Sequence, residues 1–305
     1  MSVQAPFDGI ESKVIELDTN LDDLKVEVMD DVSWISNVAL ESGSVSTLTF
    51  AVAPNKEQNA RSAAIRISSV ANPDISCDLS VIQGYFNGLD DSNLDKSKYI
   101  TYVEDYEYEG YGDAFDYNMY DYGTTIYSKG LAYSSKIECK FCLNSFSEGN
   151  YYISVGEYDD SIYKIYINQK GLNIGSSLYT WGDMGVSSTS EITLVLSGTT
   201  MIVNGKTISG IPDVDDYMEG YIWSGHYHER DDGMWWTDYT FQDGGKIYYA
   251  KGWNNEGQLI YIGGASLSDD DRASWKSVYY DKDTGKVVTV NHFPRVSNSF
   301  GRGNL

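Results

Sequence analysis

Residues 192–208 carry two hairpin signals in quick succession. Residues 192–197 alternate between aliphatic and smaller side chains, which is the side-chain period of a β-strand. Ser197-Gly198 is a turn dipeptide, and Asn204-Gly205 is the strongest short hairpin signal. Such an apolar meander is not stable alone in water and needs a second sheet to cover it. The stretch therefore predicts strands inside a β-sandwich.

The length and composition extend this prediction to the whole chain. A chain of 305 residues favours two domains, or one large β domain with a small companion. A hydrophobic content of 41% is enough for sizeable cores, and helical periodicity is not sustained over any long window. We therefore expect an all-β protein.

The charge balance excludes some partners. With 22 Lys and Arg against 45 Asp and Glu, the formal net charge is −23. This argues against binding to a nucleic acid backbone or an anionic membrane surface, both of which attract clustered positive charge. No apolar run is long enough to span a bilayer. The N-terminal residues lack the features of a leader, so we expect either a cytosolic protein or one whose leader was removed.

The three cysteines, Cys77, Cys139 and Cys142, do not form a disulfide framework. Cys139 and Cys142 lie three positions apart on a predicted strand, so they point to opposite faces. We expect buried free thiols.

The first part of the chain contains short strand signals typical of an immunoglobulin-like sandwich, at residues 13–17, 24–28, 46–52, 61–68 and 77–83. Its pieces, in order, are Trp34-Ile35, residues 47–52, Pro54-Asn55, Arg61 with residues 63–67, and residues 79–83. This order resembles a BACON domain, over roughly residues 5–84. The resemblance implies a module of gut Bacteroides-type surface proteins, acting as a spacer. We expect Trp34 to belong to the core and not to a sugar platform.

A polar, acidic stretch separates this module from the rest. We predict an N-terminal domain at residues 1–84, a linker at 85–98 and a second domain at 99–305. Residues 91–95 imitate the start of a calcium loop, but Lys96 stands where the loop needs glycine.

The second part also resembles a family. The pieces are residues 137–143, 151–156, 162–168, 192–203, Asn204-Gly-Lys206 and 244–248. They resemble a laminin G-like, concanavalin A-like jelly roll with a C-terminal extension, over about residues 99–290. Such domains often hold a structural calcium ion, but no ligand set stands out here. The aromatic and charged stretch at 213–240 departs from the family pattern.

Catalytic and metal motifs are not evident. Residues 157–160 are the nearest match to a laminarinase-like carboxylate pattern, but the second glutamate is missing. His226, His228 and Glu229 show local spacing without the further convergent ligands that zinc requires. We predict no catalytic residue, no metal ligand and no cofactor.

The strongest functional signal is aromatic. We predict ligand contacts at Trp223, Tyr227, Trp235, Trp236 and Tyr239, because flat rings stack on sugars and nearby carboxylates accept hydrogen bonds from hydroxyls. The alternative is that these rings fill the sandwich core.

These observations favour a non-catalytic, exported protein that binds a glycan or another surface ligand through the second domain. The resemblances imply a place at the cell surface or in the periplasm, with a leader or lipid anchor lying upstream. Two alternatives are a laminarinase-like glycoside hydrolase and an adhesive or structural protein with a protein partner.

Overall fold

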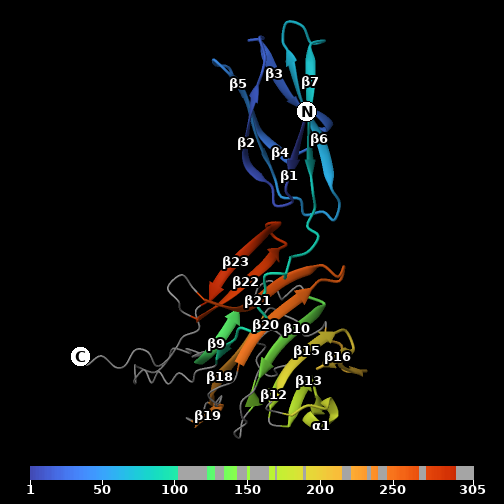
Figure 1. Ribbon diagram of the computed structural model, residues 1–305, viewed down its shortest axis with the longest axis vertical. Helices are drawn as coiled ribbons and strands as arrows, with labels where there is room; N and C mark the ends of the chain where they lie inside the picture. The colour runs from blue at the N-terminus through green and yellow to red at the C-terminus, as the bar shows by residue number, and fades with distance from the viewer. Residues whose placement is uncertain are drawn as a thin grey trace, which may run out of the picture. The chain divides into compact units, whose positions relative to one another are not determined.

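The computed structural model describes residues 1–101, 122–127, 134–142, 150–151, 165–168, 170–187, 190–214, 221–231, 235–239, 246–267 and 273–292. Within these residues the chain is built almost wholly of β-strands, as predicted (Figure 1). It divides into two compact units. Unit 1 comprises Met1–Asn87 with Tyr280–Val288, and unit 2 comprises Gly88–Tyr279 with Thr289–Leu305.

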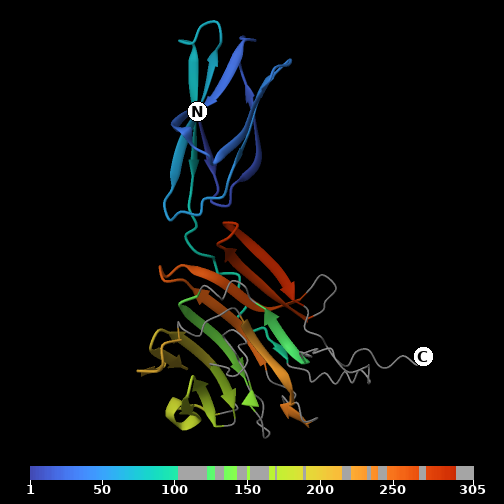
Figure 2. The same cartoon turned by 180° about the vertical axis from the view of Figure 1, so that it is seen from behind.

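Unit 1 is a two-sheet sandwich, which confirms the predicted immunoglobulin-like class (Figure 2). One sheet has the order β1-β7-β6-β3 and the other β2-β5-β4. The strands are β1 (Ser2–Ala5), β2 (Ile10–Leu17), β3 (Leu24–Val28), β4 (Ile35–Glu41), β5 (Ser46–Val52), β6 (Arg61–Ser69) and β7 (Ser76–Gln83), with a short 3-10 turn at Met29–Asp31.

The core of unit 1 follows from strand alternation. Leu48 and Phe50 on β5 face Ile65 on β6 and Val81 on β7, and all four are fully buried. Trp34 packs against this cluster, as predicted. Strand β1 runs parallel to β7.

Unit 2 is organised around a nine-stranded sheet, although residues Tyr280–Val288 at one edge of this sheet are counted with unit 1. The main path is β17-β16-β15-β10-β20-β21-β22-β23, with β8 paired to β20. These strands are β8 (Ile100–Thr101), β10 (Lys136–Cys142), β15 (Glu191–Ser197), β16 (Thr200–Val203), β17 (Lys206–Ser209), β20 (Lys246–Trp253), β21 (Leu259–Leu267), β22 (Ala273–Asp281) and β23 (Lys286–His292). We call this the long sheet. An extended antiparallel sheet of this kind is consistent with the predicted jelly roll.

The predicted meander at residues 192–208 is confirmed. It forms β15, β16 and β17 with continuous antiparallel register. Val203 pairs with Lys206, and Asn204 and Gly205 between them have φ of 46° and 84°. Positive φ at both central residues is the geometry of a type I′ turn, which matches the twist of the flanking strands.

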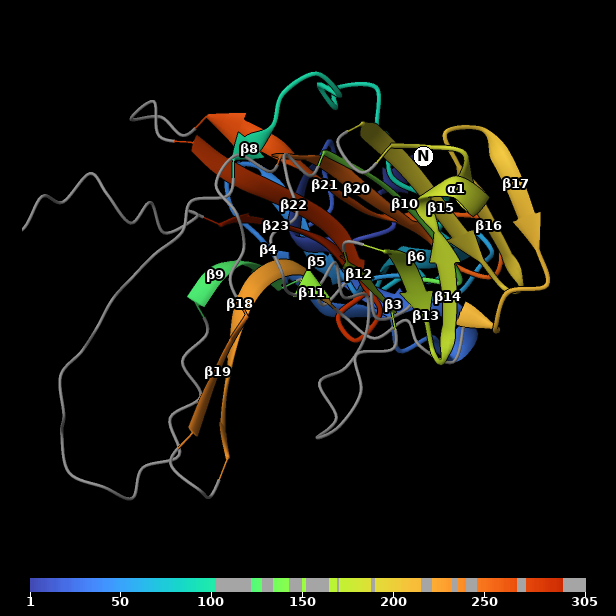
Figure 3. The same cartoon turned by 90° about the horizontal axis from the view of Figure 1, so that it is seen from below.

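Two further sheets belong to unit 2. One has the order β11-β12-β13-β14, with β11 (Asn150–Tyr151), β12 (Ile165–Asn168), β13 (Gly171–Ile174) and β14 (Ser177–Thr180). The other has the order β19-β18-β9, with β9 (Tyr122–Tyr127), β18 (Tyr221–Asp231) and β19 (Trp235–Tyr239). Figure 3 shows β12, β13 and β14 lying across from β10, β15 and β16.

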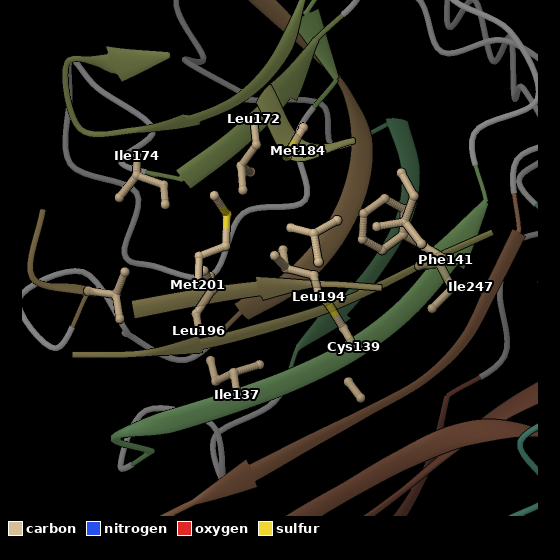
Figure 4. Close-up of a cluster of buried hydrophobic side chains, with 14 of the residues drawn as sticks. Ile137, Cys139, Phe141, Leu172, Ile174, Met184, Leu194, Leu196, Met201 and Ile247 are labelled. Atoms are coloured by element: carbon tan, nitrogen blue, oxygen red, sulfur yellow. The ribbon is translucent and has the colours of Figure 1, made fainter. Parts of the chain in front are cut away.

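The predicted cover for the meander is present. Leu194 and Met201 of the long sheet share one buried cluster with Leu172 and Ile174 of β13 (Figure 4). Met184 of the one-turn helix α1 (Trp181–Met184) closes the cluster. No helix in the described part of the chain has the length and hydrophobicity to cross a bilayer.

The cysteines depart in part from expectation. None of the three forms a disulfide, and Cys139 is buried in the core while Cys142 lies on the opposite side of β10 and is partly exposed. Cys77, however, is exposed, so its predicted burial is wrong. The reason is its position: burial on β7 begins only at Leu79, so Cys77 lies at the end of the sandwich beyond the core.

Candidate functional site

The predicted ligand contacts lie on two paired strands. Tyr227 is opposite Tyr239, Arg230 opposite Trp236, and Asp231 opposite Trp235 in the β18–β19 ladder. Trp223 lies further along β18, opposite Thr125 of β9. The backbone of these five predicted residues is described, but their side chains lie outside the described part of the structure.

The weaker sequence candidates are placed as follows. Residues 157–160 lie outside the described residues, as do the side chains of His226, His228 and Glu229. Asp91, in the stretch that imitates a calcium loop, lies 3.3 Å from the amine of Lys251. Among the described residues no group of three or more His, Cys, Asp and Glu side chains could hold a metal ion.

In unit 1, the residues that carry the BACON resemblance form a structural network. The Nε of Arg61 donates to the side-chain oxygen of Gln83 at 2.8 Å, and its Nη2 donates to the carbonyl of Ala53 at 2.9 Å. Gln83 is fully buried and donates to the carbonyls of Pro6 and Ala53. These bonds tie the loop after β5 to the end of β7 and to the N-terminal segment.

Two further members complete this network. The guanidinium carbon of Arg61 lies 4.6 Å from the centre of the Trp34 ring, so one face of that ring is occupied. Asn55 is fully buried and donates to the carbonyls of Asn59 and Gly84. Because these polar groups are satisfied internally, they stabilise the sandwich and leave little for a ligand.

In unit 2, one face of the long sheet carries several charged and aromatic side chains. Ile137, Cys139 and Phe141 of β10 point into the core, so the alternate residues Lys136 and Lys140, with Glu138 between them, point to the other side. We call this side the outer face. Register places Trp253 opposite Lys136, Lys251 opposite Glu138, and Tyr249 opposite Lys140.

A bulge gives this face two consecutive tyrosines. The β10–β20 register shifts between Lys140 and Phe141, which leaves Tyr248 as an extra residue in β20. The Tyr248 hydroxyl donates to Glu191 at 2.6 Å. The Tyr249 hydroxyl donates to Glu138 at 2.9 Å. The bulge therefore turns both rings toward carboxylates of neighbouring strands.

A buried lysine lies at the centre of the outer face. Lys251 is only 6% exposed, and its amine lies 3.1 Å from a carboxylate oxygen of Glu138 and 3.3 Å from one of Asp91. The amine also lies 5.1 Å from the centre of the Trp253 ring. A buried ammonium group requires such partners, because burying it unpaired would be costly.

Residues 88–99 cover this part of the face. Leu89 donates its backbone N–H to the carbonyl of Leu259 at 2.7 Å, and Asp91 pairs with Lys251. The Tyr99 ring meets the Tyr248 ring edge to face at 5.5 Å between centroids. Sequence analysis missed this face. The signal was the charge alternation at residues 136–140, which a strand packed between two apolar layers would not carry.

Three groups of the outer face have shifted pKa values. Hydrogen bonds from Lys140 and Tyr248 lower the pKa of Glu191. Burial, followed by the hydrogen bond to a glutamate, raises the pKa of both Tyr248 and Tyr249. On the core side of β10, burial raises the pKa of the Cys139 thiol to about 12. A general acid would need a carboxyl with a raised pKa, and a nucleophile a thiol with a lowered one. This face is arranged to hold charges and rings in place.

Comparison with known proteins adds one finding. Residues 24–83, which run from the start of β3 to the end of β7, match the BACON family, described as "Putative binding domain, N-terminal". The chain matches no curated protein and no solved structure. The predicted BACON resemblance is thereby confirmed for these residues, and the laminin G-like resemblance of the second part stays a prediction. Residues 24–83 are therefore similar to a family of domains that is described as a binding domain.

Proposed function

We propose that this chain is an exported, non-catalytic binding protein that recognises a glycan through the β18–β19 hairpin of unit 2. The supporting observation is the hairpin register. It brings Tyr227, Trp235, Trp236 and Tyr239 into one short antiparallel ladder, although Tyr227 comes well before the other three in the sequence. Rings gathered on one scaffold are what stacking on a sugar requires.

The charges in the same ladder support a sugar ligand. Asp231 and Asp238 lie within the paired residues, and their carboxylates are acceptors for sugar hydroxyls. The resemblance to concanavalin-type sandwiches, a class that includes lectins, favours the same function. Unit 1 then serves as a spacer, because the residues that carry its family resemblance are engaged in its own hydrogen bonds.

The non-catalytic part of the proposal rests on the carboxylates. In the described part of the chain, each carboxyl with a resolved shift has a lowered pKa. A glycoside hydrolase needs one carboxylic acid with a raised pKa as its general acid. The resemblance of unit 1 to surface-protein modules supports the proposed location at the cell surface or in the periplasm, with a leader or anchor upstream.

The test is a binding screen of the intact chain against neutral plant and host polysaccharides. The full chain is needed because residues 88–98, which a fragment beginning at 99 would lack, cover the outer face of unit 2. Trp235→Ala and Tyr227→Ala should each weaken binding about tenfold or more, the loss expected for one stacking ring. Tyr85→Ala is the matched control, since it removes an exposed tyrosine from unit 1.

Three outcomes would contradict the proposal. One is the absence of saturable binding to every polysaccharide. Another is equal loss of affinity in Tyr85→Ala and the hairpin variants. The third is release of reducing sugar from a bound polymer, which would identify a hydrolase. Thermal unfolding of each variant, followed by circular dichroism, separates lost contacts from lost folding.

A further inference from the structure

The outer face of the long sheet carries an excess of positive charge in a strongly acidic chain. Eight charged groups on this face and on the segment that covers it are linked through shared rings and ion pairs, and five of them are lysines: Lys96, Lys136, Lys140, Lys246 and Lys251. Three are carboxylates: Asp91, Glu138 and Glu191. We call these eight residues the lysine face. The whole chain has a net charge of −23, so the sign of the charge is locally reversed here.

The carboxylates of the lysine face neutralise only its middle. Lys251 is shared between Glu138 and Asp91, and Lys140 lies 2.8 Å from Glu191. Asp91 also lies 3.9 Å from Lys96. These pairs fix the centre of the cluster and leave it without a free binding group.

The two ends of the lysine face carry the available charge. The amine of Lys136 lies 4.4 Å from the centre of the Trp253 ring, and that of Lys246 lies 4.2 Å from the centre of the Tyr99 ring. Neither amine has a carboxylate within 4.0 Å among the residues that the structure describes. A ring below an ammonium group holds it in place and leaves its N–H donors for another acceptor.

The spacing of the two ends indicates an elongated ligand. Lys246 is opposite Cys142, six residues along β10 from Lys136. At about 3.3 Å per residue, the two amines are carried by backbone positions roughly 20 Å apart. A small anion would meet only one of them, whereas a polymer with repeated negative charges would reach both.

We propose that the lysine face binds an acidic polysaccharide whose sugars carry carboxylates, such as a uronic acid polymer. Negative charge over the rest of the chain repels such a ligand, so the local field directs it to this face. The Tyr99 side chain, 45% exposed, offers a ring edge beside Lys246 for a sugar. This surface is separate from the β18–β19 hairpin, and the two proposals stand independently.

The test is a titration of the intact protein with polygalacturonate, with dextran as the uncharged polymer. Binding of polygalacturonate should weaken between about 50 and about 200 mM NaCl, as expected for ion pairing. The variant Lys136→Gln/Lys246→Gln should bind at least about tenfold more weakly, the effect of losing one or more charge-assisted hydrogen bonds. Lys13→Gln/Lys25→Gln is the matched control, because it changes the net charge equally at two exposed lysines of unit 1.

Four outcomes would overturn this proposal. Absence of polygalacturonate binding at low salt, or equal binding of dextran, excludes an acidic-polymer site. An equal loss in the control variant shows that only the overall charge matters. If duplex DNA binds as tightly as polygalacturonate, the site recognises negative charge alone and not a sugar. If Trp235→Ala abolishes binding to neutral glycan but leaves polygalacturonate binding unchanged, the two surfaces act separately, as expected.

Discussion

The indole nitrogen of Trp275 donates a hydrogen bond to the hydroxyl oxygen of Tyr261 at 3.3 Å. The same hydroxyl lies 3.0 Å from that of Ser277, and all three side chains are buried in unit 2. Gly263 is opposite Ser277 in the β21–β22 ladder. A Cβ atom at Gly263 would overlap the Tyr261 hydroxyl and lie 2.6 Å from the indole nitrogen. The buried polar pair therefore depends on a position without a side chain.

We expect Gly263→Ala to lower the free energy of unfolding by about 1–3 kcal/mol, the usual cost of overpacking. Urea unfolding followed by tryptophan fluorescence measures this change. Gly182→Ala is the control, because the nearest atom to its added Cβ is the Thr180 hydroxyl at an ordinary 3.8 Å. Equal stability of the two variants would contradict the packing argument.

Lys251→Met should destabilise unit 2 by about 2–3 kcal/mol, because it leaves Glu138 and Asp91 without their shared amine. This expected loss of stability is smaller than the usual loss for a fully buried ion pair, since Asp91 keeps some contact with water. Lys98→Met removes an exposed pair with Asp95 and should cost less than about 1 kcal/mol. Hydrogen exchange should also quicken at residues 88–99 in Lys251→Met alone. Unchanged exchange there would show that the ion pair does not hold the cover.

Arg61→Lys should lower the stability of unit 1 by about 1–3 kcal/mol, although the charge is kept. The planar guanidinium of arginine bonds Gln83 and the Ala53 carbonyl at the same time while it lies over the Trp34 ring. The single amine of lysine cannot make this set of contacts. Differential scanning calorimetry of the intact chain measures the change. Arg66→Lys alters an exposed ion pair with Asp78 and should change the midpoint temperature of unfolding very little. A similar shift in both variants would contradict the role of the network.

Unit 2 should lose stability in alkali. The pKa of Tyr249 is raised above its usual value in the folded state, and that of the Cys139 thiol is about 12. Unfolded thiols and phenols ionise near pH 8.5 and 10. The stabilisation is therefore complete below about pH 8 and declines as pH rises above about 9. Urea midpoints measured from pH 7 to 11 should fall, and less steeply in Tyr249→Phe. Tyr85→Phe, at an exposed tyrosine, should keep the original slope.

Thiol labelling should distinguish the three cysteines. Cys77 is exposed and should react with a disulfide reagent at once, whereas Cys139 is buried with a raised pKa and should react only on unfolding. Cys142, partly exposed with a pKa raised first by burial, should react at an intermediate rate. Mass spectrometry of labelled peptides at intervals gives the order. Early labelling of Cys139 would contradict its place in the core.

Local patterns in the sequence determined the strands of both units. The predicted strands at residues 24–28 and 46–52 coincide with β3 and β5, because alternation of apolar and polar residues directly reports a half-buried strand. Asn204-Gly205 fixed a hairpin, since its turn chemistry is contained in two residues. The order of motifs also identified the BACON resemblance, later matched at residues 24–83.

Only the tertiary structure decided what lies on each side of those strands. The parallel pairing of β1 with β7 joins segments far apart in the chain, and no local pattern specifies such a partner. The burial of Lys251 depends on a distant segment that crosses the sheet, whereas a lysine side chain is ordinarily exposed to solvent. Alternation predicts which residues share a face, but whether that face is covered depends on contacts between remote parts of the chain. For this reason the sequence determined the sandwich, and the tertiary structure decided where its polar groups gather.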